Sequence, residues 1–278
     1  MAELGTGPLV LLLHGFPEFW WSWRYHLPAL AATGMRAVAV DLRGYGDSDK
    51  PPRGYDLWTL SGDVAGLVRA LGERQADLVG HDWGGILSWC TAALHPRVVR
   101  SVTVLAAAHP RAMGQALLRD PVQRSAAHYL VSVQAPWLPE RSLTRDGAVL
   151  VERILRSGAG PQWCASSEFP AVARRYREAM LIPGAAHCAL EYYRWVGRSQ
   201  FRFDGRRLSH AVDRTVRVPV LQLHGADDPY VLERTARRSA RWAGDGYRYE
   251  VLPGVGHFVP QEAPEHTTAL LTEFLGTL

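Results

Sequence analysis

Lysine is nearly absent from this chain of 278 residues, and its positive charge is almost all arginine. Lys50 is the only lysine among 31 positively charged side chains, and the formal net charge is +4. The arginines are scattered singly or in pairs, such as Arg174–Arg175 and Arg206–Arg207, and form no basic tail. Codon bias of a GC-rich genome explains this composition, so we expect no nucleic-acid partner.

Cysteine is also scarce. Cys90, Cys164 and Cys188 are odd in number and far apart in sequence, and no C-x-x-C occurs. This pattern suggests neither a disulfide framework nor a zinc site. The chain also lacks a glycine-rich phosphate loop and metal-ligand spacing, so we expect no cofactor and no bound metal.

Long apolar runs are missing as well. No stretch approaches the roughly 20 apolar residues of a membrane-spanning helix, so no membrane partner is expected. The first apolar run, Leu9–Leu13, lacks a cationic leader and a small-residue cleavage site. It is therefore interpreted as a strand and not as a signal peptide, which predicts a cytoplasmic location. A monomer and a homodimer are both compatible with the sequence.

Strand-like and helix-like segments alternate at both ends of the chain. The alternation runs to about residue 108 and resumes at V-P-V-L-Q-L-H-G, residues 218–225. Short, nearly continuous apolar strands of this kind are typical of a parallel sheet with helices on both faces. The stretch between them contains helical segments without strands, broken by A-P-W-L-P-E and S-G-A-G-P-Q. We predict an α/β core of residues 1–108 and 213–278, with a helical cap of residues 109–212 inserted in it.

One tight turn stands out in the first half. The segment V-G-H-D-W-G-G-I, residues 79–86, places Asp82 between an apolar run and a helical segment. Glycine two residues before and two residues after the central residue is the pattern of a nucleophile elbow. Serine is usual there, whereas a carboxylate would attack an sp³ carbon and form an alkyl ester with the enzyme. The simpler alternative is that Asp82 only caps the following helix; three glycines around it favour the nucleophile.

These segments resemble the α/β-hydrolase fold nearly from end to end. The resemblance includes L-L-L-H-G-F-P near the N-terminus and the loop D-L-R-G-Y-G-D-S-D-K-P at residues 41–51. Members of that family usually begin with an antiparallel hairpin, but only eight residues precede Leu9 here. We therefore expect either that the start of the chain is cut or that the sheet lacks its first strand.

The same resemblance implies the other catalytic residues. His257, in L-P-G-V-G-H-F-V-P, is implied as the general base, and the order nucleophile, acid, histidine is the order of this fold. The acid that orients it is implied at Asp228, with the adjacent Asp227 as the alternative. The backbone N–H groups of Phe16 and Trp83 are implied as the oxyanion hole.

Two reaction classes use an aspartate in this elbow, the epoxide hydrolases and the haloalkane or haloacid dehalogenases. Opening an epoxide gives an alkoxide, which needs a hydrogen bond that a tyrosine hydroxyl can donate. The segment H-Y-L-V-S-V-Q resembles an epoxide hydrolase cap segment and points to Tyr129. The segment A-R-R-Y-R-E-A-M-L-I-P-G-A-A-H-C-A-L-E-Y-Y-R resembles a second one, and its tyrosine is taken as Tyr176. Phe16 stands where many haloalkane dehalogenases have an asparagine.

The chain is therefore identified as a member of the epoxide hydrolase family, similar to soluble epoxide hydrolase. The resemblance implies a small apolar epoxide as substrate, opened to a vicinal diol through an ester on Asp82. A dehalogenase using the same aspartate and a non-catalytic ligand-binding protein of this fold remain the alternatives. Histidines 14 and 81 are interpreted as structural. The expected substrate pocket is formed by Phe16, Pro17, Trp20, Trp83 and Phe258.

Overall fold

A single seven-stranded sheet forms the centre of the structure, a computed structural model that describes residues 1–278. The strand order is β1-β3-β2-β4-β5-β6-β7, and every neighbouring pair is parallel except β1 with β3. This confirms the predicted α/β fold. The strands are β1 (Ala2–Leu4), β2 (Leu9–Leu13), β3 (Arg36–Val40), β4 (Ala76–His81), β5 (Val99–Leu105), β6 (Val220–Gly225) and β7 (Tyr247–Leu252).

Strand β1 corrects the expectation about the N-terminal hairpin. It pairs antiparallel with β3, with Glu3 opposite Val38, and the Glu3 carboxylate accepts a hydrogen bond from Arg36 at 2.7 Å. One strand of the expected hairpin is therefore present at this edge of the sheet, although it is only three residues long.

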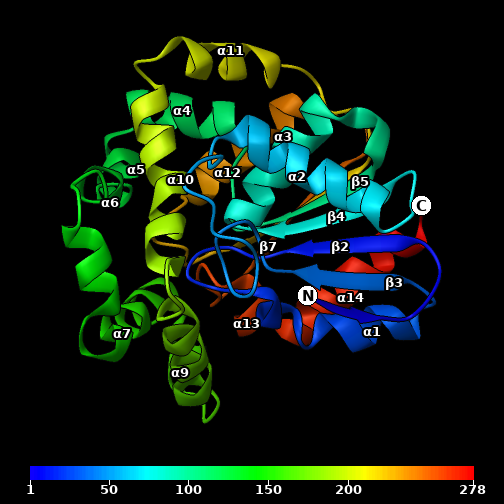
Figure 1. Ribbon diagram of the computed structural model, residues 1–278. Helices are drawn as coiled ribbons and strands as arrows, with labels where there is room; N and C mark the ends of the chain where they lie inside the picture. Colours follow the sequence, from blue (N-terminus) through cyan, green and yellow to red (C-terminus); the bar gives the residue numbers. More distant parts are fainter.

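Helices cover both faces of the sheet. Alternate side chains of β2 point to opposite faces, and all five are buried because a layer of helices packs against each face. Leu9, Leu11 and Leu13 belong to the core shared with α2 and α3, whereas Val10 and Leu12 pack with α1 and α14. Figure 1 shows these two helix layers on either side of the strands. The core helices are α1 (His26–Ala32), α2 (Leu57–Ala70), α3 (Trp83–Leu94), α12 (Glu233–Arg237), α13 (Val259–Glu262) and α14 (Pro264–Gly276), with short 3-10 helices η1 (Trp20–Trp23), η2 (Pro96–Val98) and η3 (Arg238–Trp242).

Eight helices come between β5 and β6, where the sequence predicts a cap. They are α4 (Pro110–Arg119), α5 (Pro121–Ala126), α6 (Tyr129–Ser132), α7 (Leu138–Gly158), α8 (Pro161–Cys164), α9 (Phe169–Met180), α10 (Ala185–Ser199) and α11 (Phe203–Ala211). Figure 1 shows α7, α9 and α10 beyond the end of the sheet toward which the parallel strands point. Helix α4 also packs against α12 and η3 of the core, so the boundary at residue 109 stays a prediction. No helix of the structure combines the length and the apolar character needed to cross a bilayer.

Candidate active site

Asp82 occupies the turn between β4 and α3 in a strained backbone conformation. Its φ of 46° and ψ of −112° are rarely adopted by a residue with a side chain. A Cβ atom on Gly80 would collide with the carbonyl of Gly84, and one on Gly84 would collide with the carbonyl of Leu13. Only glycine fits these two positions, so the elbow pattern in the sequence has a direct steric cause. The turn lifts the carboxylate above the end of the sheet.

The Asp82 carboxylate lies against the loop that follows β2. Its Oδ2 atom accepts a hydrogen bond from the backbone N–H of Phe16 at 3.0 Å. Trp83 is the first residue of α3, so its N–H has no acceptor within that helix. The Phe16 N–H thus contacts the carboxylate, and the role of the Trp83 N–H as a second donor stays a prediction. The side chain of Asp82 is only 16% exposed.

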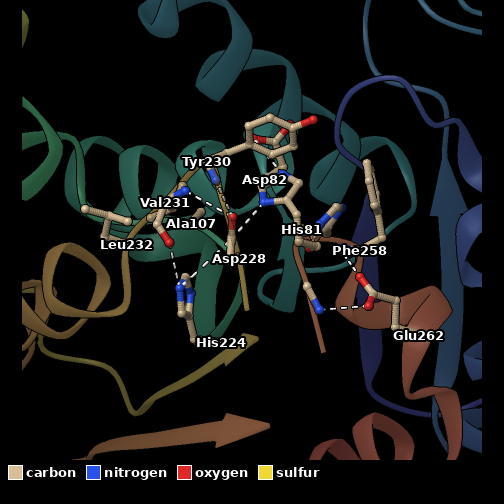
Figure 2. A network of polar contacts seen from close by, with 12 residues as sticks. His81, Asp82, Ala107, His224, Asp228, Tyr230, Val231, Leu232, Phe258 and Glu262 are labelled. Atoms are coloured by element: carbon tan, nitrogen blue, oxygen red, sulfur yellow. Dashed lines mark hydrogen bonds and ion pairs between the residues drawn. The ribbon is translucent and has the colours of Figure 1, made fainter. Parts of the chain in front are cut away.

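His257 and Asp228 come from the loops after β7 and β6, at the same end of the sheet. The Nδ1 atom of His257 donates to Oδ2 of Asp228 at 2.8 Å, and its Nε2 atom lies 3.8 Å from Oδ1 of Asp82. Figure 2 shows that Asp228 also accepts hydrogen bonds from the backbone of Tyr230 and Val231. Asp227 is exposed, so the structure brings Asp228 and not its neighbour to the histidine.

Carboxylates around His257 determine its protonation. Burial alone lowers the pKa of the imidazole, but the charges of Asp228, Asp82 and Glu18 outweigh burial and raise the pKa to about 9. Burial has the opposite effect on the carboxyl of Asp228 and raises its pKa, but the adjacent His257 outweighs burial and brings that pKa below its ordinary value. Asp228 therefore stays ionised and holds the proton of His257 on Nδ1, which leaves Nε2 directed at Asp82.

The loop that carries His257 is attached to the cap. The backbone N–H of His257 donates to the carbonyl of Gly158 in α7 at 2.7 Å. The Glu262 carboxylate accepts from the N–H groups of Gly256 and Phe258, which flank His257, and from the N–H of Gly160 beyond α7. Figure 2 shows Glu262 beside Phe258. One carboxylate thus fixes the position of the histidine relative to both the core and the cap.

A second carboxylate–imidazole pair lies beneath the first. Glu18 and His81 are both buried, and their Oε2 and Nδ1 atoms are 2.7 Å apart. The Nε2 atom of His81 donates to the carbonyl of His257 at 2.8 Å, so the ring is held between that carbonyl and Glu18. Burial raises the pKa of Glu18, but His81 outweighs it and lowers the pKa overall. His81 is structural, as expected, whereas Glu18 was missed because a lone acid after H-G-F-P carries no motif of its own.

His14 is also structural. Its Nε2 atom accepts a hydrogen bond from the N–H of Leu42, and its Nδ1 atom donates to the carbonyl of Gly15.

Two cavities meet at Asp82. One has a volume of about 520 Å³ and the other about 480 Å³. Both are lined by Asp82, Tyr129, Tyr193 and Val231. The first, cavity 1, extends under α6 and α7 along mainly apolar side chains and also contacts His257. The second, cavity 2, extends between α4, α10 and α11 and includes Trp83. A ligand at the carboxylate therefore has room for a substituent on each side.

Two tyrosines from the cap face this junction, Tyr129 of α6 and Tyr193 of α10. Their ring centroids are 5.8 Å apart, and Tyr193 also packs against Trp83 and Phe16. Burial and the charge of Asp82 raise the pKa of both hydroxyls, so both stay protonated at neutral pH. Tyr129 thus lines the same cavities as Asp82, and its role as a proton donor stays a prediction.

Tyr176 does not reach the cavity, which corrects the expectation from the sequence. It is fully buried in α9, packs edge-on against Phe19 and Trp21, and donates its hydroxyl to Glu18 at 3.3 Å. Tyr193 occupies the place that had been expected for it. The cue was in the same segment, because Tyr193 belongs to the Y-R pair at its end.

The Y-R pair and the glutamine after Tyr129 have a structural role. The guanidinium of Arg194 is buried, binds Glu140, and donates to the carbonyls of Val133 and Ala135. The amide of Gln134 donates to the carbonyl of Tyr193 at 3.3 Å. These bonds join the segment after Tyr129 to α10, so the two phenols are positioned together.

Three of the expected pocket residues lie elsewhere. Phe16 lines cavity 1 and Trp83 lines cavity 2, but Pro17, Trp20 and Phe258 line neither. The chain turns away after Phe16, and the Trp20 N–H donates to Asp41 at 2.9 Å. Phe258 is buried against Trp163 and His81. Phe19 and Trp21 pack against Tyr176 of the cap, whereas Trp20 and Trp23 pack in the core with α1 and α14, so none of these four aromatic residues lines cavity 1 or cavity 2.

Comparisons with known proteins agree with this architecture. Residues 8–264 match the α/β hydrolase fold family. Human epoxide hydrolase 4 is 32% identical over 273 residues, covering 96% of this chain and 72% of its own length. Epoxide hydrolase A of Mycobacterium tuberculosis is 32% identical over 296 residues, covering 96% of this chain and 90% of its own.

A solved structure is similar throughout. The crystal structure of epoxide hydrolase A from Mycobacterium thermoresistibile superposes with a TM-score of 0.84 at 30% identity, covering 99% of this chain and 93% of the other. An aspartate elbow, a histidine–aspartate pair and an inserted helical cap define the class as an α/β hydrolase. The chain belongs to the α/β-hydrolase fold family, within the group that holds these epoxide hydrolases.

Proposed function

We propose that the protein is an epoxide hydrolase, which opens an epoxide to a vicinal diol through an ester on Asp82. One observation carries this proposal: the half-buried Tyr129 and the buried Tyr193, whose hydroxyls both have raised pKa values, line the same mainly apolar cavity as the Asp82 carboxylate. The relatives that bear the name epoxide hydrolase support it. The substrate class is an apolar epoxide, since hydrophobic side chains predominate in cavity 1.

The first step is attack by Asp82 on an epoxide carbon. The N–H of Phe16 holds Oδ2, which leaves Oδ1 to form the new C–O bond. The C–O bond of the ring breaks, and its oxygen takes a proton from Tyr129 or Tyr193. We assign the second donor to Tyr193 in place of Tyr176, because the hydroxyl of Tyr176 is bound to Glu18. A carboxylate needs no base for this step.

The second step is hydrolysis of the ester with His257 as the base. Ester formation removes the negative charge of Asp82, which is one of the charges that raise the pKa of His257. The pKa therefore falls once the ester forms, so His257 releases the proton on Nε2 to solvent, and the neutral imidazole can then accept a proton from water. Hydroxide adds to the ester carbonyl, and the charge develops on Oδ2 opposite the N–H of Phe16. The diol leaves with the proton of His257, and the proton left on the Asp82 carboxyl restores the tyrosine.

Isotope incorporation tests this sequence of bonds. Styrene oxide and wild-type enzyme in excess, mixed in heavy-oxygen water, should yield a first-turnover diol without label and a labelled peptide containing Asp82. The Asp82→Ala variant should form no diol. A first-turnover diol that already contains the heavy oxygen would show that water attacks the epoxide directly, and the ester mechanism would be rejected.

A further inference from the structure

One corner of the cap exposes large apolar side chains. Leu118 at the end of α4 is 80% exposed, Phe201 between α10 and α11 is 88% exposed, and Phe203, the first residue of α11, is 76% exposed. Leu118 lines cavity 2 together with Gln200 and Gly205, which adjoin the two phenylalanines, and Figure 1 shows α11 beside α4. We call these three residues, Leu118, Phe201 and Phe203, the apolar corner.

Arginines surround the apolar corner. Between residues 195 and 212 the chain has Asp204 as its only carboxylate. Arg206 and Arg207 follow Phe203 by three and four residues on α11, so they share its side of the helix. The exposed arginines of this region are Arg119, Arg198, Arg202, Arg206 and Arg207. Apolar side chains ringed by cations are typical of a surface that lies on an anionic membrane.

Cavity 2 reaches the surface at the same corner. Its lining includes the exposed residues Leu118, Gln200 and Arg206 at one end and Asp82 at the other. A path therefore leads from the apolar corner to the nucleophile. The cavity is about 480 Å³ in volume, enough for an apolar substituent of the substrate.

We propose that the apolar corner docks on an anionic lipid bilayer and takes up lipid-dissolved epoxides through cavity 2. The choice of epoxides rests on the proposed function; the docking does not. A second copy of this chain fits poorly, because a symmetric contact would place these arginines against the same arginines. Docking of this kind needs no membrane-spanning segment, so the proposal replaces the sequence-based expectation of no membrane partner.

Vesicle binding tests the docking without reference to catalysis. Wild-type protein should sediment with vesicles of phosphatidylcholine containing about one phosphatidylglycerol in three, and not with phosphatidylcholine alone. Phe201→Ser with Phe203→Ser should weaken binding roughly tenfold for each side chain. Arg202→Glu with Arg207→Glu should weaken it roughly 20-fold or more, because each basic residue contributes about fivefold.

Matched variants keep the test specific. Val131→Ser with Trp137→Ser removes equally exposed apolar side chains from another corner of the cap, and Arg74→Glu with Arg97→Glu makes the same charge change on the core. Both controls should bind like wild type. None of the substituted residues lines cavity 1 or cavity 2, so all variants should turn over water-soluble styrene oxide equally.

Three results would overturn the proposal. They are equal binding by corner and control variants, equal binding to both vesicle types, and a concentration-dependent dimer that only the phenylalanine variants abolish. Loss of styrene oxide turnover in wild type would instead count against the proposed function and leave the docking result standing.

Discussion

Removing the two phenolic hydroxyls that face Asp82 should slow epoxide opening and spare other chemistry. Tyr129 and Tyr193 both line the two cavities, and burial keeps their hydroxyls protonated. Losing one donor to a developing oxyanion typically costs about 100-fold or more in rate. Tyr129→Phe and Tyr193→Phe should each slow alkylation of Asp82 by about that factor.

The double variant shows whether the hydroxyls act on one oxygen. Independent donors would give a loss of roughly 10⁴-fold, the product of the single effects. The two rings pack edge to face with their centroids 5.8 Å apart. We therefore expect the effects of the two substitutions to be coupled and the loss in the double variant to depart from that product. Tyr176→Phe is the matched control: it removes an equally buried hydroxyl that binds Glu18, and alkylation should change less than tenfold.

The assay is single-turnover alkylation by styrene oxide, followed by mass spectrometry of the Asp82 peptide. An alkyl halide of similar shape provides a second comparison, since halide leaves without a proton and should not need the phenols. If Tyr176→Phe slowed alkylation as much as Tyr193→Phe, our placement of the second donor would be wrong. If the double variant opened epoxides at the wild-type rate, the epoxide hydrolase proposal would fail, and a dehalogenase would become the favoured assignment for this protein.

Three further predictions concern the groups behind Asp82. His257→Gln should form the ester but not hydrolyse it, so intact-protein mass spectrometry should show one added substrate mass that Asp82→Ala lacks; continued turnover without a trapped ester would contradict this. In wild type, alkylation should stay constant as pH rises toward 9, because that step uses no base and the raised pKa values of Tyr129 and Tyr193 keep both donors protonated. Ester hydrolysis should instead increase with pH through a pKa below the value of about 9 in the free enzyme. The two rates measured separately by stopped flow check the sign, and parallel profiles would refute the loss of charge at Asp82. Glu18→Gln removes one of the charges that raise the pKa of His257, so the pH profile of ester hydrolysis should move to lower pH. It also removes the partner of His81, so kcat should fall about tenfold with KM little changed. An unmoved pH profile would mean that Glu18 only fills space.

The proposed catalytic residues on the core could be located from sequence because each follows a strand in a recognisable turn. Gly80 and Gly84 mark Asp82 by steric necessity, and parallel strands bring their carboxyl ends to one edge of the sheet. The choice of Asp228 over Asp227 needed the structure, since adjacent residues in a turn point in different directions. Asp228 is buried and bonded to His257, whereas Asp227 is exposed.

The cap was less predictable because no strand fixes the direction of its helices. Tyr176 and Tyr193 lie in one sequence segment but on different helices, α9 and α10, and only their packing decides which hydroxyl reaches the cavity. Likewise, aromatic residues after H-G-F-P could line a pocket or fill the space beneath a cap. Phe19 and Trp21 show the second outcome, since both pack edge-on against Tyr176 of α9.

The attachment of the His257 loop to the cap limits how this enzyme could be recombined with its relatives. A chimera that took its cap from another family member would import both phenols, and with them a new shape of cavity. It would also replace Gly158 and Gly160, whose carbonyl and N–H hold the histidine loop directly and through Glu262. Exchange of substrate range by grafting a cap therefore changes the position of the histidine as well, unless Gly158 and Gly160 are kept native within the graft.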